Sequence, residues 1–347
     1  MERDATTPLL AITMGDVAGI GPEIVAKSLA RADLYDRCRP LVIGDERVLR
    51  DAIGSTGVGL EVRPVGAPDE GSYRHGGVDI LQPGDPIGDF EIGEVSEQAG
   101  AKSVEFIEAA ADFGRTGQVQ GIVTAPLNKE AMHRAGFTYP GHTELLAELF
   151  DVKNFSLVLT AEDRYFFHIT THVSLRDAIE GVTVERTLAI LRLANTFAKA
   201  VGKQDEPIAV TGFNPHASEG GLFGDEEEER LRPAMARAAE EGIETVGPLP
   251  ADAVIPQTVQ GRYRLLVVCY HDQGHAPFKA VYGDQGVNIT VGLPVVRTSV
   301  DHGTAFDIAG QGIAREDSLL VAVDQAIHLA PYWRDIYETM KRFTTDG

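Results

Sequence analysis

The stretch LLAITMGDVAGIGPEIVAKSLA, residues 9–30, joins an apolar run to a helical pattern through a segment rich in glycine. Residues 9–14 form a short apolar run, which is typical of a buried β-strand. Pro22 opens the next segment, and proline is favoured at the first position of a helix. We therefore predict a strand at 9–14 and a helix at 22–30. A strand followed by a helix is the repeating unit of α/β folds.

The same alternation of apolar runs and helical patterns continues along the chain. Further strands are predicted at 40–45, 121–126, 155–160, 165–172, 207–213, 264–270 and 286–293, and further helices at 46–53, 98–115, 183–201 and 317–343. Strands separated by helices indicate a mostly parallel sheet. The four residues at 161–164 are too few for a crossover, so a hairpin is expected there and the sheet should be mixed.

The length of the chain and the lack of an obvious linker predict two interwoven lobes. The 347 residues exceed what one hydrophobic core usually supports. We predict one discontinuous lobe from residues 1–138 and 311–347, and a second lobe from residues 139–310. The expected fold class is a two-lobed α/β/α arrangement with a mixed, mostly parallel sheet.

The formal net charge of −21 argues against binding to nucleic acid or to an anionic membrane. An anionic ligand would need a local cluster of cations. The run GDEEEER, residues 224–230, is predicted to be a solvated helix start, where acidic groups are favourable. The absence of a long apolar run, of a signal-peptide pattern and of more than two cysteines predicts a cytoplasmic protein.

Three histidines stand at the end of a predicted strand or just past it: His172, His216 and His271. Ligands of open α/β sheets bind beyond the carboxyl ends of the strands, so these side chains could share one site. Neutral imidazole is a common ligand of zinc-like ions, and three such ligands leave a fourth position open for chemistry. Each histidine taken alone fits a structural role better than a metal-binding one, and it is the matching position of all three that favours a metal site. His168, four residues before His172, is predicted to be a packed core residue.

A second set of residues has the character of an anion site. His142 and Thr143 stand where a loop enters a predicted helix, whose free N–H groups can bind anions. Lys279 and Arg297 supply positive charge near Asn288. Surface salt bridges are the alternative role for both cations. The glycines Gly15, Gly19 and Gly21 do not fit the usual dinucleotide fingerprint, although Gly19 and Gly21 could let the backbone approach a ligand. A tight turn from strand to helix is the alternative role.

The motifs GDVAGIGPE, TAPLNK, GHTE, THVSLRD, NPHASEGG, GPLPAD, YHDQG and GVNITVGLPVVRTSVDHGTAFDIAG occur in this order between about residues 13 and 314. Together they resemble the 4-hydroxythreonine-4-phosphate dehydrogenase family, known from pyridoxal phosphate (vitamin B6, pyridoxine) biosynthesis. Two of the motifs are also similar to those of isocitrate and isopropylmalate dehydrogenases, whose fold the resemblance implies. The resemblance further implies a cytoplasmic, NAD-dependent and metal-dependent oxidoreductase that decarboxylates its product.

The resemblance implies roles for individual residues. It places one divalent metal per subunit, zinc or magnesium, manganese or cobalt, on His172, His216 and His271. The third histidine would come from the other subunit of a homodimer with a shared active site. The implied substrate-binding residues are His142, Thr143, Lys279, Asn288 and Arg297, and the catalytic candidates are Asp252, Asp272 and Lys279. NAD or NADP is expected in the cleft between the lobes, near Gly15, Gly19, Gly21, His302, Gly303, Thr304 and Asp307.

His275 departs from the biosynthetic pattern, in which an apolar residue follows YHDQG. The sequence GHAPFK resembles a catabolic branch that oxidises 4-phospho-D-threonate or 4-phospho-D-erythronate to dihydroxyacetone phosphate and carbon dioxide. The alternatives are 4-phosphohydroxy-L-threonine dehydrogenase, a dehydrogenase of aromatic cis-dihydrodiols, a metal-dependent hydrolase or aldolase, and a non-catalytic sensor. The expected partner is an anionic small molecule.

Overall fold

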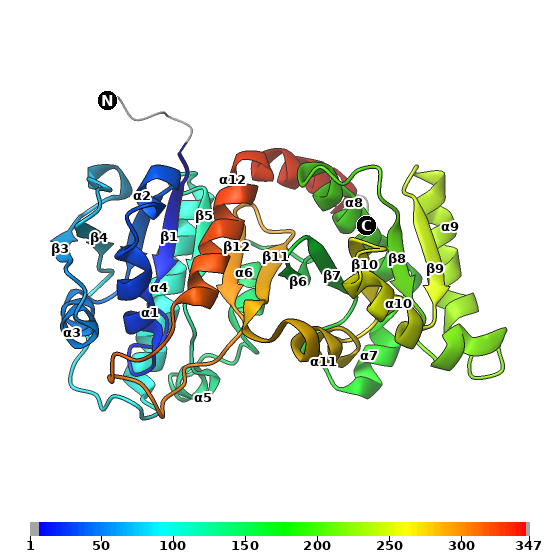
Figure 1. Cartoon of the computed structure of the whole chain (residues 1–347). Coiled ribbons are helices and arrows are strands. Elements are labelled where there is room, and N and C mark those ends of the chain that lie inside the picture. Colours follow the sequence, from blue (N-terminus) through cyan, green and yellow to red (C-terminus); the bar gives the residue numbers. More distant parts are fainter. Residues whose placement is uncertain (1–6, 345–347) are drawn as a thin grey trace. The chain divides into compact units, whose positions relative to one another are not determined.

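The computed structural model describes residues 7–344, which divide into two compact units. One unit consists of the described residues up to Val152 together with Leu293–Trp333. The other consists of Lys153–Gly292 and the residues from Arg334 onward. Figure 1 shows the course of the chain through both. Helix α12 (Asp317–Thr344) begins in the first unit and ends in the second.

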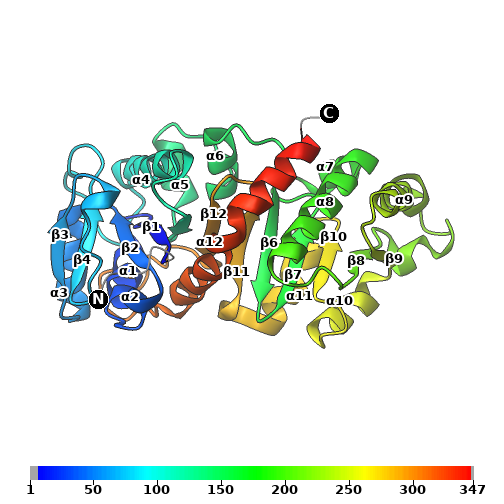
Figure 2. The ribbon, with the colours of Figure 1, turned by 90° about the horizontal axis from the view of Figure 1, so that it is seen from above.

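The first unit contains a parallel sheet with strand order β3-β4-β2-β1-β5-β12. Its strands are β1 (Leu9–Thr13), β2 (Arg39–Ile43), β3 (Glu61–Pro64), β4 (Gly77–Leu81), β5 (Gly121–Thr124) and β12 (Val296–Val300). Figure 2 shows helices on both faces of the sheet. One face carries α1 (Gly21–Leu29), α2 (Leu34–Arg37) and α3 (Glu46–Thr56), and the other carries α4 (Glu97–Arg115), α5 (Lys129–Arg134) and α6 (His142–Leu149).

The second unit contains a mixed sheet with strand order β11-β6-β7-β10-β8-β9. The strands are β6 (Ser156–Ala161), β7 (Arg164–His168), β8 (Ile208–Thr211), β9 (Thr245–Leu249), β10 (Leu265–Val268) and β11 (Val287–Val291). β6 pairs antiparallel with β7 and with β11, and the other pairs are parallel. The helices are α7 (Leu175–Gly181), α8 (Val184–Ala200), α9 (Arg232–Glu240), α10 (Ala251–Val259) and α11 (His271–Tyr282).

Local sequence explains where many helices begin. Side-chain oxygens of Asp45, Ser96, Ser174 and Thr183 each accept a hydrogen bond from a backbone N–H of the first turn. Such caps satisfy donors that have no partner inside the helix. In the second unit α11 is anchored by Phe278, which packs among the buried side chains of β6, β7 and β10.

The predicted fold class is confirmed, and so is the hairpin, formed by β6 and β7. The predicted lobe boundaries at 138/139 and 310/311 differ from the observed ones. β12 pairs with β5 from Val296 to Ser299, and α6 contacts α4, so residues 139–152 and 293–310 belong to the first unit. The described residues from Arg334 onward, predicted for the first lobe, belong to the second unit. The sequence patterns also missed β3, β4, β9, β12, α2, α7, α10 and α11. Among residues 7–344, no helix is long and apolar enough to cross a membrane.

Candidate active site

Helix α11 begins at His271, three residues after β10 ends, and Gln273 fixes this junction. The Gln273 Oε1 atom accepts hydrogen bonds from the backbone N–H of Cys269 at 2.7 Å and from the Thr211 hydroxyl at 2.8 Å. Its Nε2 donates to the Gly212 carbonyl at 2.8 Å. Gln273 is buried, so these bonds are shielded from water. One side chain therefore ties the ends of β8 and β10 together.

One face of α11 carries three functional candidates at four-residue spacing: His271, His275 and Lys279. Residues four apart on a helix are neighbours on its surface. The rings of His271 and His275 are stacked, with centroids 3.7 Å apart and planes 9° apart. Lys279 is exposed, and its charge is one of the causes that lower the pKa of His275. Residues 271–279, for which the sequence patterns predicted no secondary structure, thus form an ordered helical face.

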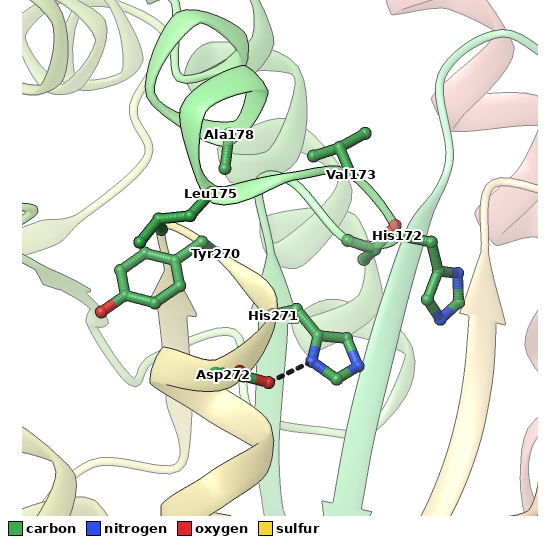
Figure 3. Close-up of a pocket in the computed structure, with 8 residues that line it drawn as sticks. His172, Val173, Leu175, Ala178, Tyr270, His271 and Asp272 are labelled. Atoms are coloured by element: carbon green, nitrogen blue, oxygen red, sulfur yellow. Dashed lines mark hydrogen bonds and ion pairs between the residues drawn. The ribbon is translucent and has the colours of Figure 1, made fainter.

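His271 and His172 lie close enough to consider a shared metal ion. Their ring centroids are 5.6 Å apart. The Asp272 carboxylate lies 2.7 Å from His271 Nδ1, which leaves Nε2 of that ring for a ligand. A carboxylate bound to the far nitrogen is the usual support of a metal-ligating histidine. Figure 3 shows both histidines at a pocket of about 290 Å³, beside Val173, Leu175 and Tyr270.

His216 lies on a separate loop of the second unit. His216, Ala217, Ser218 and Glu219 all have positive φ angles, between 47° and 65°. This conformation is costly for residues other than glycine and tends to occur at functional sites. The buried Glu227 carboxylate holds the loop, because it accepts hydrogen bonds from Asn214 N at 2.7 Å and Asn214 Nδ2 at 2.9 Å.

This role of Glu227 corrects the prediction that residues 224–230 are only a solvated helix start. Glu226 is also engaged, since its carboxylate accepts from Asn214 Nδ2 at 2.5 Å. The prediction failed because residues 225–229 are all acidic, and composition does not show which carboxylate turns inward. Glu227 begins a short π-helical turn that leads into α9.

The predicted histidine trio is not assembled within one chain. Over residues 7–344, no group of three His, Cys, Asp or Glu side chains is arranged to hold a metal ion. His172 and His271 are neighbours and have the chemistry of a metal site, whereas His216 belongs to another loop. His172 also lies in the loop after β7, which ends at His168, so the predicted strand at 165–172 is too long. A third ligand from a second copy of the chain stays a prediction.

Behind His275 lies His168, which is buried as predicted. Its partner was not predicted: His168 Nε2 lies 3.1 Å from His275 Nδ1. Burial lowers the pKa of His168 to about 4. Burial, followed by the nearby His168 and His271, lowers the pKa of His275 to about 2. Both rings are therefore neutral near pH 7.

In the first unit the structure brings Arg297, Thr143 and His142 together. The Arg297 guanidinium, on β12, donates to the hydroxyls of Thr143 at 3.3 Å and Thr124 at 2.7 Å. Burial lowers its pKa to about 10, so it stays charged near neutral pH. Burial and the charges of Arg297 and Lys129 lower the pKa of His142 well below its usual range. The Nε2 atom of His142 has no hydrogen-bond partner among the described residues.

A buried cation next to hydroxyl groups and the N-terminus of α6 is suited to bind an anion. Thr124, the threonine of TAPLNK, was not predicted to take part. Its hydroxyl comes close to Arg297 because β5 pairs with β12. Lys279 and Asn288 belong to the second unit, with Asn288 half-buried on β11. Asp252 is exposed in the first turn of α10, and Asp272 orients His271.

The predicted dinucleotide residues also lie together in the first unit. The backbone N–H of Ile20 donates to Thr304 O at 3.0 Å. A Cβ atom at Gly19 would lie 2.8 Å from Thr304 Cβ. At Gly15 and Gly21 it would lie 2.2 Å from the carbonyl oxygens of Pro126 and Met14, respectively. These glycines are therefore needed for the close packing of the backbone at this turn. Dinucleotide binding at this loop and at His302, Gly303 and Asp307 stays a prediction.

Asp16, within the same loop, was not singled out from the sequence. It is fully buried, and its Oδ1 accepts a hydrogen bond from Ala18 N at 2.9 Å. Burial raises its pKa to about 6, although hydrogen bonds from the backbone of Ala18 and Asn128 act in the opposite direction. The carboxylate form of Asp16 is thus unfavourable in the folded protein.

We expect Asp16→Asn to stabilise the protein above pH 6 relative to the wild type. Between about pH 4 and pH 6 the folded wild type keeps a proton that the unfolded chain releases, so its stability falls as pH rises. A shift from 3.8 to about 6 corresponds to about 3 kcal/mol. Urea unfolding of both proteins at several pH values measures the difference. A difference that does not grow between pH 4 and pH 6 would contradict the assignment.

Comparison with known proteins decides the family. A sequence model described as "Pyridoxal phosphate biosynthetic protein PdxA" matches residues 36–326. The chain belongs to the PdxA family. The PdxA fold is also found in the crystal structure of a 4-hydroxythreonine-4-phosphate dehydrogenase from Klebsiella pneumoniae, with a TM-score of 0.84 and 42% identity over 94% of this chain and 99% of that one.

Two further relatives carry a more specific name. "D-threonate 4-phosphate dehydrogenase" of Bordetella bronchiseptica is 56% identical over 100% of both chains. The protein of the same name from Cupriavidus necator is 45% identical over 93% of this chain and 97% of its own. These PdxA proteins are named as dehydrogenases, so the chain belongs to a family of oxidoreductases, as the resemblance of its motifs implied.

Proposed function

We propose that the protein oxidises and decarboxylates a 4-phosphorylated hydroxy acid with NAD and a divalent metal ion. The proposed substrates are 4-phospho-D-threonate and 4-phospho-D-erythronate. The carrying observation is the face of α11, where His275 stacks on His271 and Lys279 follows one turn later. The full-length similarity to the Bordetella bronchiseptica protein supports the same choice of substrate.

The residues of this chain would bind and orient the substrate. His172 and His271 would hold the metal ion, with Asp272 keeping His271 in place. Arg297, Thr143 and His142 form a cationic and hydrogen-bonding site for a phosphate or carboxylate group. In the second unit, Lys279 and Asn288 are the proposed substrate-binding residues. NADP is the alternative dinucleotide, and the group that takes the hydroxyl proton is one of Asp252, Asp272, Lys279 or a water molecule.

The proposed chemistry balances without a further reactant. A divalent cation lowers the pKa of a bound hydroxyl, and nicotinamide accepts a hydride. Oxidation at C3 transfers a hydride to NAD and releases the hydroxyl proton, which leaves a ketone β to the carboxylate. The bond from C1 to C2 then breaks, carbon dioxide leaves, and protonation of C2 gives dihydroxyacetone phosphate.

We also propose that two copies of the chain share the active site. Apolar side chains are exposed near the histidine loops: Val173 and Leu175 beside His172, and Leu222 and Phe223 beyond His216. Phe223 lies 6.1 Å from the His216 ring, measured between centroids. Clusters of exposed apolar residues often mark protein–protein contacts. A second copy could therefore bring a missing ligand to His172 and His271.

A substrate panel tests the proposal. We expect NAD reduction with 4-phospho-D-threonate or 4-phospho-D-erythronate at a kcat/KM at least about 100-fold above that of the unphosphorylated acids, since phosphate binding helps to place the reacting carbon. Release of carbon dioxide and dihydroxyacetone phosphate should match NADH formation one to one. A preference for 4-phosphohydroxy-L-threonine would instead support the biosynthetic activity named for the Klebsiella pneumoniae protein. Turnover without NAD would favour a hydrolase or aldolase.

A further inference from the structure

The imidazoles of His168 and His275 form a hydrogen-bonded pair next to His271. His168 Nδ1 lies 3.0 Å from the carbonyl oxygen of Leu157. His168 Nε2 lies 3.1 Å from His275 Nδ1. His275 Nδ1 also lies 3.2 Å from the carbonyl oxygen of His271. The two carbonyl groups fix the directions of all these hydrogen bonds.

A carbonyl oxygen can only accept, so His168 Nδ1 must carry the hydrogen that faces Leu157. For the same reason His275 Nδ1 must carry the hydrogen that faces the carbonyl of His271. The same hydrogen is shared with His168 Nε2, which bears a lone pair in a neutral ring and accepts from His275 Nδ1. In a neutral ring the second nitrogen bears a lone pair, so His275 Nε2 is left as a hydrogen-bond acceptor.

The surroundings hold this arrangement rigidly. His168 is fully buried. Its backbone N–H donates to the Ser156 hydroxyl at 3.2 Å, and the same hydroxyl donates to the His168 carbonyl at 3.1 Å. A Cβ atom at residue 274 would lie 2.5 Å from His168 Nε2, so Gly274 lets the ring approach α11. The sequence GH at 274–275 is thus matched to a histidine on β7.

His275 Nε2 has no hydrogen bond to any described residue, and 7% of the residue is exposed. Its ring is stacked at 3.7 Å on the ring of His271, the proposed metal ligand. If the metal ion on His271 holds the reacting hydroxyl, the stacked ring of His275 would lie beside the adjacent carbon of the substrate. An acceptor there would select a hydroxyl donor.

We propose that His168 is a positioning residue that holds His275 as the Nδ1–H tautomer, so that His275 Nε2 accepts a hydrogen bond from the substrate hydroxyl next to the reacting carbon. This inference rests on the proposed function, because it takes C3 as the reacting carbon. The specificity is then for an acid with a hydroxyl at C2.

The kinetic test compares 4-phospho-D-threonate with 3-hydroxy-4-phosphobutanoate, which lacks the C2 hydroxyl but keeps the reacting one. We expect the wild type to prefer the first by about 10- to 100-fold in kcat/KM. The preference should disappear in His275→Leu and fall by about tenfold in His168→Leu. His168→Gln keeps a donor for Leu157 and an acceptor for His275, so it should restore most of the preference.

Ser156→Ala is the matched control for His168→Leu. It removes a hydroxyl that contacts the backbone of His168 but leaves the imidazole pair intact. The control should keep the wild-type preference within about twofold, even if it lowers the midpoint of thermal unfolding. A wild-type preference in correctly folded His168→Leu, or an equal loss in Ser156→Ala, would overturn the proposal.

The second readout is the tautomer itself, measured on metal-free protein labelled with ¹⁵N-histidine. Long-range ¹H–¹⁵N spectra should show Nδ1–H and a bare Nε2 for His168 and His275, assigned by the loss of signals in the variants. In His168→Leu, or in His168→Gln if the former does not fold, the His275 signals report whether the tautomer depends on residue 168. Nε2–H at His275 in the wild type would refute the inference. If the wild type oxidises neither acid, the proposed function fails and the C2 specificity falls with it, while the spectra still decide the role of His168.

Discussion

His271→Ala is expected to lower kcat/KM for the phosphorylated acid by about a thousandfold or more. A metal ion contributes several kcal/mol to the stabilisation of charge in the reaction, and each 1.4 kcal/mol corresponds to a factor of ten. The ring is half-exposed and its Nδ1 is held by Asp272, so its loss should cost little stability. Steady-state kinetics, elemental analysis for bound metal and thermal unfolding measure the three effects.

Asp272→Asn is the graded comparison for this experiment. It removes the charge next to His271 Nδ1 but keeps an oxygen that can accept a hydrogen bond. Loss of such a supporting carboxylate typically costs 10- to 100-fold in metal affinity or activity, which is less than the loss of the ligand. A His271→Ala protein that retains both metal and activity would eliminate the metal site proposed here.

Mixed dimers show whether His172 and His271 of one chain bind the same ion. If His271 completes the site of the partner subunit, a dimer of one His172→Ala and one His271→Ala chain has one intact site. Roughly a quarter of the wild-type activity should then return after random reassortment, since half of the dimers are mixed and one of their two sites is intact. If His172 and His271 of the same chain act together, every site lacks a ligand and no activity returns.

The second large effect is expected for Arg297→Met. The buried guanidinium donates to two neutral hydroxyls, and its loss would remove a charged, two-pronged partner for phosphate or carboxylate. Hydrogen bonds to charged groups are worth about 1.5–3 kcal/mol each, so two of them correspond to a loss of about 100- to 1,000-fold or more in kcat/KM. Most of this loss should appear in KM. Arg297→Lys should be intermediate, because the charge remains but the planar fork is lost.

Arg186→Met provides a matched control in the second unit. Arg186 also has a pKa lowered to about 10 by burial, and it donates to the backbone carbonyls of Ile169 and Phe155. Its substitution should reduce stability and leave KM for the acid unchanged. An equal rise of KM in both variants would mean that Arg297 acts through the fold and does not bind the substrate.

The parts of the fold that the sequence predicted are those governed by local patterns. Apolar runs and helical periodicity gave the α/β class, and the short connection at 161–164 gave the β6–β7 hairpin. Helix α11 was missed because Gly274 and Pro277 lie inside it, and both residues disfavour helices. Strand β12 was missed because Arg297, a buried charge, interrupts its apolar run.

The sequence predicted which residues are candidates for the site, but not the contacts between them. The histidines at 172, 216 and 271 stood out because each closely follows a predicted strand. The contacts of His168 with His275, and of Glu227 with Asn214, join residues 107 and 13 positions apart. No periodicity or spacing in the sequence records such contacts, because they depend on how strands and helices pack. The same holds for the meeting of Thr124, Thr143 and Arg297.

Gln273 links the two loops that carry the candidate metal ligands His216 and His271. The loop with His216 follows the end of β8, and His271 follows the end of β10. The side-chain amide of Gln273 is hydrogen-bonded to both strand ends. Glutamate in its place would lack the N–H that faces the Gly212 carbonyl, and asparagine would be one methylene too short to span the gap. The positions of the two loops are therefore coupled. A change that moves the end of β8 or of β10 is expected to move both His216 and His271.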